Sequence, residues 1–318
     1  MMKKRTTSGL KSSLFSGSLP AFVLLLASSA IIACTMALAT PQAPEKPPEQ
    51  EIQTTTPEDQ DPNVEGQETT TQTPQVTPEI TAGFENAVII GQYTAISSVA
   101  DVGRIENLRL AAESIDGIII EPGGIFSFNA VVGDVERDNR YQLAPVVADG
   151  ALAYGRGGGT CQVSSALYIA ALYTNLKIVE RHPHSAVVDY VPIGLDATVS
   201  YSSKDLKLSN ETGYPIKINA VAEGQSVTVT ILGHPLEEGI RIEPLSVLLE
   251  YHRAGTPLPS DVSGNADLIN SSFYIVESFR VFYYHGNQQE SVLLSRDLYL
   301  VLNEAVVRLP DGNLETTK

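Results

Sequence analysis

The chain has 318 residues, of which 43% are hydrophobic and 18% charged, and its formal net charge at pH 7 is −16. This length accommodates about two domains, and the hydrophobic content is sufficient for a folded core. The negative charge argues against nucleic acid as a partner, because a phosphate backbone repels an acidic protein. Half of that charge is local, since residues 41–80 hold nine acidic side chains and one basic residue, Lys46.

The N-terminal residues predict attachment to a membrane. Four basic side chains within residues 1–18, the predicted cytoplasmic end, precede an apolar segment at residues 19–39. That segment is long enough to cross a bilayer as a helix, and the basic flank favours export of the C-terminal remainder of the chain. Cys34 gives the alternative of a bacterial lipoprotein signal, in which this cysteine is lipidated. Both alternatives predict a cell-membrane protein, single-pass or lipid-anchored, whose folded part is extracytoplasmic.

Residues 40–83 are dominated by Pro, Thr, Gln and Glu. Such a segment buries too little apolar surface to fold, so it is predicted to be a disordered stalk. Residues 84–233 are predicted to form the core domain, and residues 234–318 a C-terminal β module. With Cys34 in the membrane or lipidated, Cys161 has no partner for an intramolecular disulfide.

The residue patterns predict an α+β fold, with two helices packed on a mostly antiparallel β-sheet and a small all-β module after it. One helix is expected at residues 104–115, ending at Gly117, and the other begins near Cys161. In the first half, strands are expected at 87–97, on both sides of a Pro-Gly-Gly turn within 117–133, and in a hairpin at 146–154. Further strands are expected at 176–181, 196–201, 205–209 and 240–251, with a loop at 254–267. Two hairpins are also expected, one from residues 216–222 and 225–232 and one from residues 273–284 and 290–299.

Residues 155–172 combine a glycine-rich loop with the start of the second helix. Thr160 is predicted to cap this helix, and Asn175 is predicted to end it in a left-handed conformation. Cys161 falls in the first turn, where unpaired N–H groups and the helix dipole favour a thiolate. A cysteine also packs well in a buried position, so the local sequence leaves reactivity and packing both open.

Candidate partners for the thiol follow in chain order. His182 and His184 come 21 and 23 residues after Cys161, and Asp189 and Asp196 come later. A thiol enzyme needs a histidine to take the thiol proton and an acid to orient the imidazole. The predicted catalytic set is therefore Cys161 as nucleophile, His182 or His184 as base and Asp196 as the orienting acid.

Other residues near the cysteine are assigned to the substrate. Gln162 or the N–H groups of the glycine loop are predicted to stabilise an oxyanion. The substrate groove is predicted to include Gly157, Gly158, Gly159 and Ser164.

A zinc site is an alternative to thiol chemistry, with Cys161, His182 and His184 as ligands. Pro183 between the histidines disturbs the geometry that such a site needs, so thiol chemistry is preferred and no cofactor is expected. A second alternative is a non-catalytic binding scaffold, in which Cys161 only packs.

Six motifs resemble those of the VanW-like family. They are LAAESIDG (110–117), EPGGIFSFNAVVG (121–133), GGGTCQVSSALYIAAL (157–172), IVERHPHS (178–185), YVPIGLDATVSY (190–201) and NETGYPI (210–216). The resemblance covers residues 104–218 and implies a bacterial extracytoplasmic protein with an accessory role in glycopeptide resistance or cell-wall maintenance. It implies no particular reaction.

Two further resemblances point to the same compartment. The order Cys161, His182 or His184, Asp196 is similar to that in papain-like cell-wall peptidases and transglutaminases. Residues 278–301 resemble, more weakly, the five-glycine β module of cell-surface proteins, which implies binding to wall glycans. Together the sequence predicts a tethered envelope protein that acts on or binds peptidoglycan or another wall glycan. If it is an enzyme, it is a cysteine-dependent hydrolase or transferase.

Overall fold

The computed structural model describes residues 84, 86–148, 151–258, 268, 270–302 and 306–316. All of them belong to the second of two compact units of the chain, Thr71–Lys318. The predicted membrane segment, with Cys34, and the predicted stalk up to residue 83 lie outside the described residues. Among the helices that are described, none has the length and apolar character needed to span a membrane.

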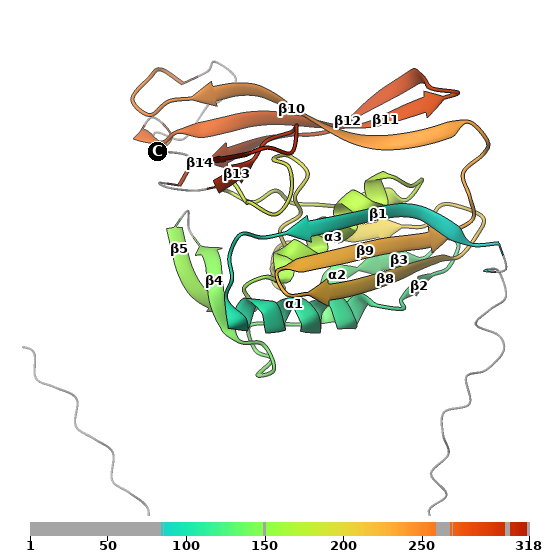
Figure 1. Cartoon of the computed structure of the whole chain (residues 1–318), viewed down its shortest axis with the longest axis horizontal. Helices are drawn as coiled ribbons and strands as arrows, with labels where there is room; N and C mark the ends of the chain where they lie inside the picture. The colour runs from blue at the N-terminus through green and yellow to red at the C-terminus, as the bar shows by residue number, and fades with distance from the viewer. Residues whose placement is uncertain are drawn as a thin grey trace, which may run out of the picture. The chain divides into compact units, whose positions relative to one another are not determined.

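A four-stranded antiparallel sheet supports the site (Figure 1). Its order is β1 (Val88–Ile96), β9 (Ser226–Gly233), β8 (Ile216–Glu223) and β2 (Ile119–Ile120). Alternate residues along β8 and β9 are buried, as expected for strands with one face on the core. The predicted hairpin of these two strands is confirmed, and the segment at 87–97 is one long strand.

Helices α1 (Val102–Ile115) and α3 (Thr160–Leu172) pack against this sheet and against each other. Asp101 caps α1, since its carboxylate accepts a hydrogen bond of 2.9 Å from the Arg104 N–H. Every residue of α3 except Cys161 is buried, so this helix lies at the centre of the core. Both predicted helices are confirmed.

The predictions for the two ends of α3 are wrong. Gly159 occupies the cap position with a φ of 109°, which favours glycine, and the Thr160 hydroxyl instead donates to the Gly157 carbonyl at 2.7 Å. The helix ends at Leu172, followed by Tyr173 in the right-handed region. Asn175 does not have the predicted left-handed conformation, because His285 is the only non-glycine residue with positive φ in the described part of the chain.

A third helix, α2 (Phe128–Val132), replaces the second half of the strand predicted after the Pro-Gly-Gly turn. It forms because the Ser127 hydroxyl accepts a hydrogen bond from the N–H of Ala130 and caps it. The strands on either side of the turn also do not pair with each other. Strand β2 pairs with β8, and β3 (Ile125–Ser127) pairs with β7.

The remaining strands form smaller antiparallel sheets. One has the order β3-β7-β6, with β7 at Lys207–Ser209 and β6 at Lys177–Glu180. The predicted hairpin at 146–154 is confirmed as β4 (Leu143–Ala148) and β5 (Ala151–Arg156). The architecture is therefore α+β and mostly β-sheet, with three described helices rather than two.

The C-terminal strands form their own sheets. Strands β10 (Ile240–His252), β11 (Phe273–Tyr284) and β12 (Asn287–Leu300) lie in that order, and β13 (Val306–Arg308) pairs with β14 (Leu314–Thr316). The predicted hairpin of β11 and β12 is confirmed, whereas β13 and β14 have no counterpart among the predicted strands. Most of the predicted loop at 254–267 lies outside the described residues.

The C-terminal sheet contacts the segment that precedes Asp196. The Val187 N–H donates to the Leu300 carbonyl at 3.1 Å, and Val187 packs with Tyr274, Val276 and Tyr299 in a small buried cluster. These contacts bring β12 close to the candidate site. The boundary between residues 233 and 234 stays a prediction.

The strand predicted at residues 196–201 is not formed. Its alternating sequence suits a strand, but its backbone groups bond to side chains of α3 instead of to a neighbouring strand. The Ala197 N–H donates to Ser165 Oγ at 2.9 Å, and the Ala197 carbonyl accepts from Ser164 Oγ at 2.6 Å. The Val199 N–H lies 3.5 Å from the sulfur of Cys161 and donates to it. This irregular segment is thereby fixed against the start of α3.

Gly91 of β1 packs so closely on α3 that a methyl group has no room. A Cβ atom at this position would lie 2.2 Å from the Ala170 carbonyl oxygen. We expect Gly91→Ala to lower the free energy of unfolding by about 3 kcal/mol, as overpacking does. Gly213→Ala is the control, because its Cβ meets nothing within 4 Å. Urea unfolding of both variants measures the difference, and equal stabilities would contradict the close contact.

Candidate active site

The glycine loop before α3 is held by close packing that only glycine permits. A Cβ at Gly158 would lie 2.7 Å from the Pro145 carbonyl oxygen. The Gly158 carbonyl accepts a hydrogen bond of 2.9 Å from the Asn107 side chain on α1, which also donates to the Gln142 carbonyl. The loop is therefore fixed between α1 and β4, and it delivers Cys161 in the first turn of α3, as predicted.

Cys161 is the only residue of α3 that is not buried, and its thiol is free. Its sulfur lies 3.7 Å from the Thr198 hydroxyl and 3.6 Å from the Val199 carbonyl oxygen. The residue 196–201 segment thus forms one wall around the sulfur. The opposite side is open to a pocket.

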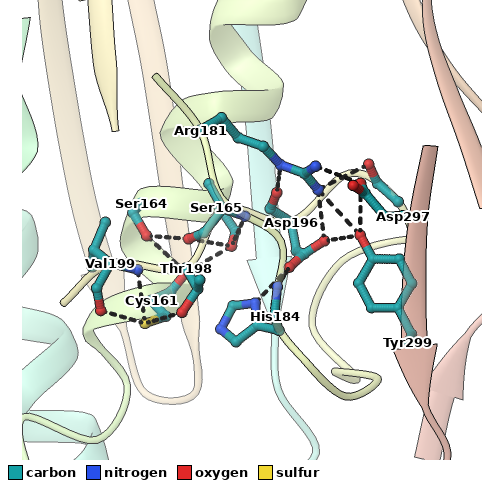
Figure 2. A network of polar contacts seen from close by, with 12 residues as sticks. Cys161, Ser164, Ser165, Arg181, His184, Asp196, Thr198, Val199, Asp297 and Tyr299 are labelled. Atoms are coloured by element: carbon teal, nitrogen blue, oxygen red, sulfur yellow. Dashed lines mark hydrogen bonds and ion pairs between the residues drawn. The ribbon is translucent and has the colours of Figure 1, made fainter. Parts of the chain in front are cut away.

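His184 lies between Cys161 and Asp196 in Figure 2. Its Nδ1 is 2.5 Å from Asp196 Oδ2, and its backbone N–H donates to the same oxygen at 2.7 Å. The double contact fixes both the ring and the chain of His184. Nε2 is the other ring nitrogen, and the Tyr190 hydroxyl lies 3.2 Å from it.

The three groups shift each other's pKa. Burial alone would raise the pKa of Cys161, but the hydrogen bond and the charge of His184 lower it to about 7. Burial alone would lower the pKa of His184, but Asp196 and Cys161 raise it to about 9. Because the thiol is the stronger acid of the two, a thiolate and an imidazolium coexist between these pH values.

Asp196 is fully buried and is held in its charged form. Burial would raise the pKa of this carboxyl, but the charge of Arg181 and the hydrogen bond from His184 hold it well below its usual range. Arg181 Nη2 lies 3.0 Å from Asp196 Oδ1, and the Tyr299 hydroxyl donates to the same oxygen at 2.6 Å. Each carboxylate oxygen therefore has a strong donor.

The C-terminal sheet supplies part of this network, which the sequence did not predict. Tyr299 and Asp297 lie on β12, and the Asp297 carboxylate pairs with Arg181 at 2.5 Å (Figure 2). Both lie more than 100 residues from their partners, so no local pattern could have indicated the contact. Arg181 falls within one of the family motifs, but its neighbours in the sequence give no sign of a buried partner.

The structure separates the two candidate histidines. His182 Nε2 lies 3.0 Å from Glu180 Oε1, and its side chain is 36% exposed. Its contribution to the site is its backbone carbonyl, which accepts the Thr198 N–H at 2.8 Å. Asp189 is also set apart from the imidazoles, because its carboxylate accepts from Ser97 and Ser98.

Two predicted site residues have other tasks. Gln162 is fully buried, and its amide nitrogen donates to the carbonyls of Ala95 and Gln225. Its donors are therefore used, and we do not retain it as an oxyanion contact. Ser164 is also fully buried, bonds the Ala197 carbonyl and does not line the pocket, so its place in the groove is corrected.

The described residues contain no cluster of ligands for the zinc site given as an alternative. Within the described ranges, no three His, Cys, Asp or Glu side chains are arranged to hold a metal ion. His182 is paired with Glu180, while His184 faces Asp196 and Cys161. The two histidines do not converge as that alternative requires.

A pocket of about 880 Å³ opens over the sulfur. Gly157, Gly158 and Gly159 line it together with Cys161 and His184, and their role in a substrate groove stays a prediction. Charged side chains from several parts of the chain also line the pocket, namely Arg104, Asp134, Glu136, Arg156, Asp189 and Lys204. The space is large enough for a peptide-sized ligand.

The α+β domain therefore presents Cys161 and His184 at one pocket, with the His184 ring bound to the Asp196 carboxylate. Residues 103–232 match the family described as VanW like protein. The resemblance seen in the motifs is thus confirmed, and the chain carries a VanW-like domain.

Two curated relatives each match about half of the chain. The Bacillus subtilis protein YoaR is 39% identical over 158 residues, which is 50% of this chain and 52% of YoaR. The Vancomycin B-type resistance protein VanW of Enterococcus faecalis is 33% identical over 149 residues, 45% of this chain and 54% of that protein. This chain therefore spans about half the length of either relative. No solved structure matches the chain.

Proposed function

We propose that this protein is a membrane-tethered enzyme of the cell envelope that uses Cys161 to cleave or transfer amide-linked acyl groups of peptidoglycan peptides. The observation that supports catalysis is the Cys161–His184–Asp196 arrangement at an open pocket. The envelope setting is supported by the apolar N-terminal segment and by the likeness to a vancomycin resistance protein. An accessory role in glycopeptide resistance or wall maintenance is consistent with that setting.

The chemistry proceeds in two acyl transfers. The Cys161 thiolate attacks the amide carbonyl carbon, and the C–N bond breaks as His184 donates its Nε2 proton to the leaving amine. The product is a thioester on Cys161. Water, in a hydrolase, or an acceptor amine, in a transferase, then attacks that thioester while His184 takes its proton, and the thiolate is released.

Backbone donors for the oxyanion lie beside the sulfur. The N–H groups of Gly158 and Gly159 make no hydrogen bond to any described residue. Both residues line the pocket immediately before Cys161. Donors fixed in this way stabilise the charge that develops on the carbonyl oxygen, which is the predicted role of the glycine loop.

A non-catalytic scaffold is the competing function, and the pH profile of thiol alkylation separates the two. Deprotonation creates the reactive thiolate, so a pKa near 7 predicts that the iodoacetamide rate at Cys161 rises with a midpoint near pH 7. Mass spectrometry of the Cys161 peptide in the full-length, detergent-solubilised protein measures it. A midpoint at the ordinary thiol value, or no reaction in the folded protein, would support the scaffold.

The two histidines provide a matched pair of variants for this profile. His184→Ala removes the charge and hydrogen bond that lower the Cys161 pKa, whereas the partial burial that raises this pKa remains, so the midpoint should move from about pH 7 to 9 or higher. His182→Ala should leave the midpoint near pH 7, because His182 pairs with Glu180 instead. Equal midpoints for both variants would exclude His184 as the partner of the thiol.

A further inference from the structure

One buried cation in the pocket wall has no anionic partner. Arg104, in the first turn of α1, is 8% exposed. Its Nη2 donates to the Gln162 side-chain oxygen at 2.8 Å, while its Nε is buried without a hydrogen bond. No described acidic side chain forms an ion pair with this guanidinium.

A buried guanidinium without a carboxylate is unusual, because burying an unpaired charge is costly. Arg181, in the same domain, shows the usual solution, since it is paired with Asp196 and Asp297. Arg104 has only a neutral amide as a partner, and its Cζ lies 5.6 Å from the ring centre of Tyr190. The guanidinium therefore has N–H donors that no described acidic side chain uses.

The guanidinium is held rigidly beside the reacting groups. Gln162 cannot turn away, because its amide nitrogen donates to the carbonyls of Ala95 and Gln225. Arg104 lines the same pocket as Cys161 and His184. Tyr190 connects the two parts of the site, with its ring beside the Arg104 guanidinium and its hydroxyl 3.2 Å from His184 Nε2.

No acidic side chain that lines the pocket forms an ion pair with Arg104. Asp189 also lines the pocket, but its carboxylate is occupied by the Ser98 N–H at 2.5 Å and by the Ser97 and Ser98 hydroxyls. Arg156 Nη1 is bound to the Tyr141 carbonyl. Arg104 is thus the buried cation of this pocket that is left available to an incoming anion.

We propose that Arg104 is an anion-binding residue that receives a free carboxylate of the acyl substrate at the Cys161 pocket. Its planar, fixed donors suit a carboxylate, which can accept two parallel hydrogen bonds. Binding there would also place the scissile carbonyl of a short peptide within the same pocket as the sulfur. Calling the bound acid a substrate rests on the proposed function, whereas the binding of the carboxylate does not.

Two alkylating reagents of equal size test the proposal on the full-length protein. Iodoacetate carries a carboxylate, and iodoacetamide is its neutral counterpart. The ratio of their rates at Cys161, followed on the Cys161 peptide by mass spectrometry, reports a positive charge near the sulfur. We expect Arg104→Gln to lower the iodoacetate-to-iodoacetamide ratio about tenfold, in line with the loss of a charged hydrogen bond. Arg104→Lys keeps the charge but not the planar pair of donors, so its ratio should fall between those of wild type and Arg104→Gln.

Lys204→Gln is the matched control, because it removes a positive charge from the same pocket at a more exposed position. Its ratio should stay within about twofold of wild type, since exposed charges are screened. A fall as large as that of Arg104→Gln would assign the effect to the general field of the pocket and overturn the proposal.

If Arg104→Gln fails to fold, protection of Cys161 by added carboxylates still tests the proposal on the wild-type protein. N-acetylalanine should protect Cys161 from iodoacetamide, and the uncharged N-acetylalaninamide should not. An acetylated aspartate diamide shows whether a side-chain carboxylate serves as well as a terminal one. Equal protection by the acid and the amide would refute the carboxylate site. A midpoint near pH 9 for the iodoacetamide profile would instead count against the thiol mechanism alone.

Discussion

Replacing Cys161 by Ala or by Ser should reduce muropeptide release or exchange by at least about 10³-fold, because removal of the nucleophile leaves only binding and oxyanion stabilisation. Serine is the more informative change. It keeps a hydrogen-bonding atom near the Val199 N–H, but a hydroxyl does not ionise near pH 7 as this thiol does. Chromatography and mass spectrometry of digests of purified peptidoglycan measure the loss.

The second cysteine of the chain is the natural control for this experiment. Cys34→Ser in the purified protein should leave turnover unchanged, since Cys161 is the cysteine that reacts in the proposed mechanism. Full turnover by both Cys161 variants would end the thiol mechanism and leave the binding scaffold. Trapping of a thioester on the Cys161 peptide, at a mass equal to an acyl fragment of the wall peptide, would identify the acyl donor directly.

Local signals were sufficient for much of the fold. Helix α1, the β8–β9 hairpin and the position of Cys161 in the first turn of α3 all depend on residues within a few positions of each other. Cys161 and Asp196 were also predicted to act in one catalytic set. Because the two are 35 positions apart, this prediction came from the general requirements of thiol chemistry and not from a local sequence pattern.

The choice between His182 and His184 could not be made from the sequence. Both are next to Pro183 and have nearly the same spacing from the cysteine. The choice depends on the irregular chain near Asp196, whose carboxylate binds both the backbone and the ring of His184. That conformation in turn depends on hydrogen bonds between Ala197 and the serines of α3. The alternating sequence of residues 196–201 predicted a strand and gave no sign of these bonds.

Long-range partners explain the other errors. From its position near the start of a helix, Gln162 was expected to be available to the substrate. Its side-chain oxygen instead accepts a buried hydrogen bond from Arg104, which lies 58 positions earlier. Likewise, nothing near Asp196 in the sequence indicates Tyr299, 103 positions later. The C-terminal sheet, predicted as a separate module, therefore contributes to the environment of the candidate acid.

Asp196→Asn should give the largest combined loss of activity and stability. The change leaves His184 buried without its compensating charge and Arg181 with Asp297 alone, and breaking such a buried pair costs about 3–5 kcal/mol of unfolding free energy. Without the carboxylate the pKa of His184 falls, its positive charge is lost near neutral pH, and the pKa of Cys161 rises. We therefore expect the midpoint of Cys161 alkylation to move upward and turnover to fall by about 10⁴-fold.

Two further variants separate the charge of Asp196 from its neighbours. Asp189→Asn removes an acid from the same pocket that does not contact His184, so the alkylation midpoint should stay near pH 7. Tyr299→Phe removes the hydroxyl that donates to Asp196 Oδ1 and accepts from Arg181 Nη2, and it should cost about 1–2 kcal/mol of stability with a smaller upward move of the midpoint. A midpoint that moves with Asp189 but not with Asp196 would mean that Asp196 serves stability alone. A midpoint that moves with Tyr299 would show that β12 positions the acid through which His184 acts on the thiol.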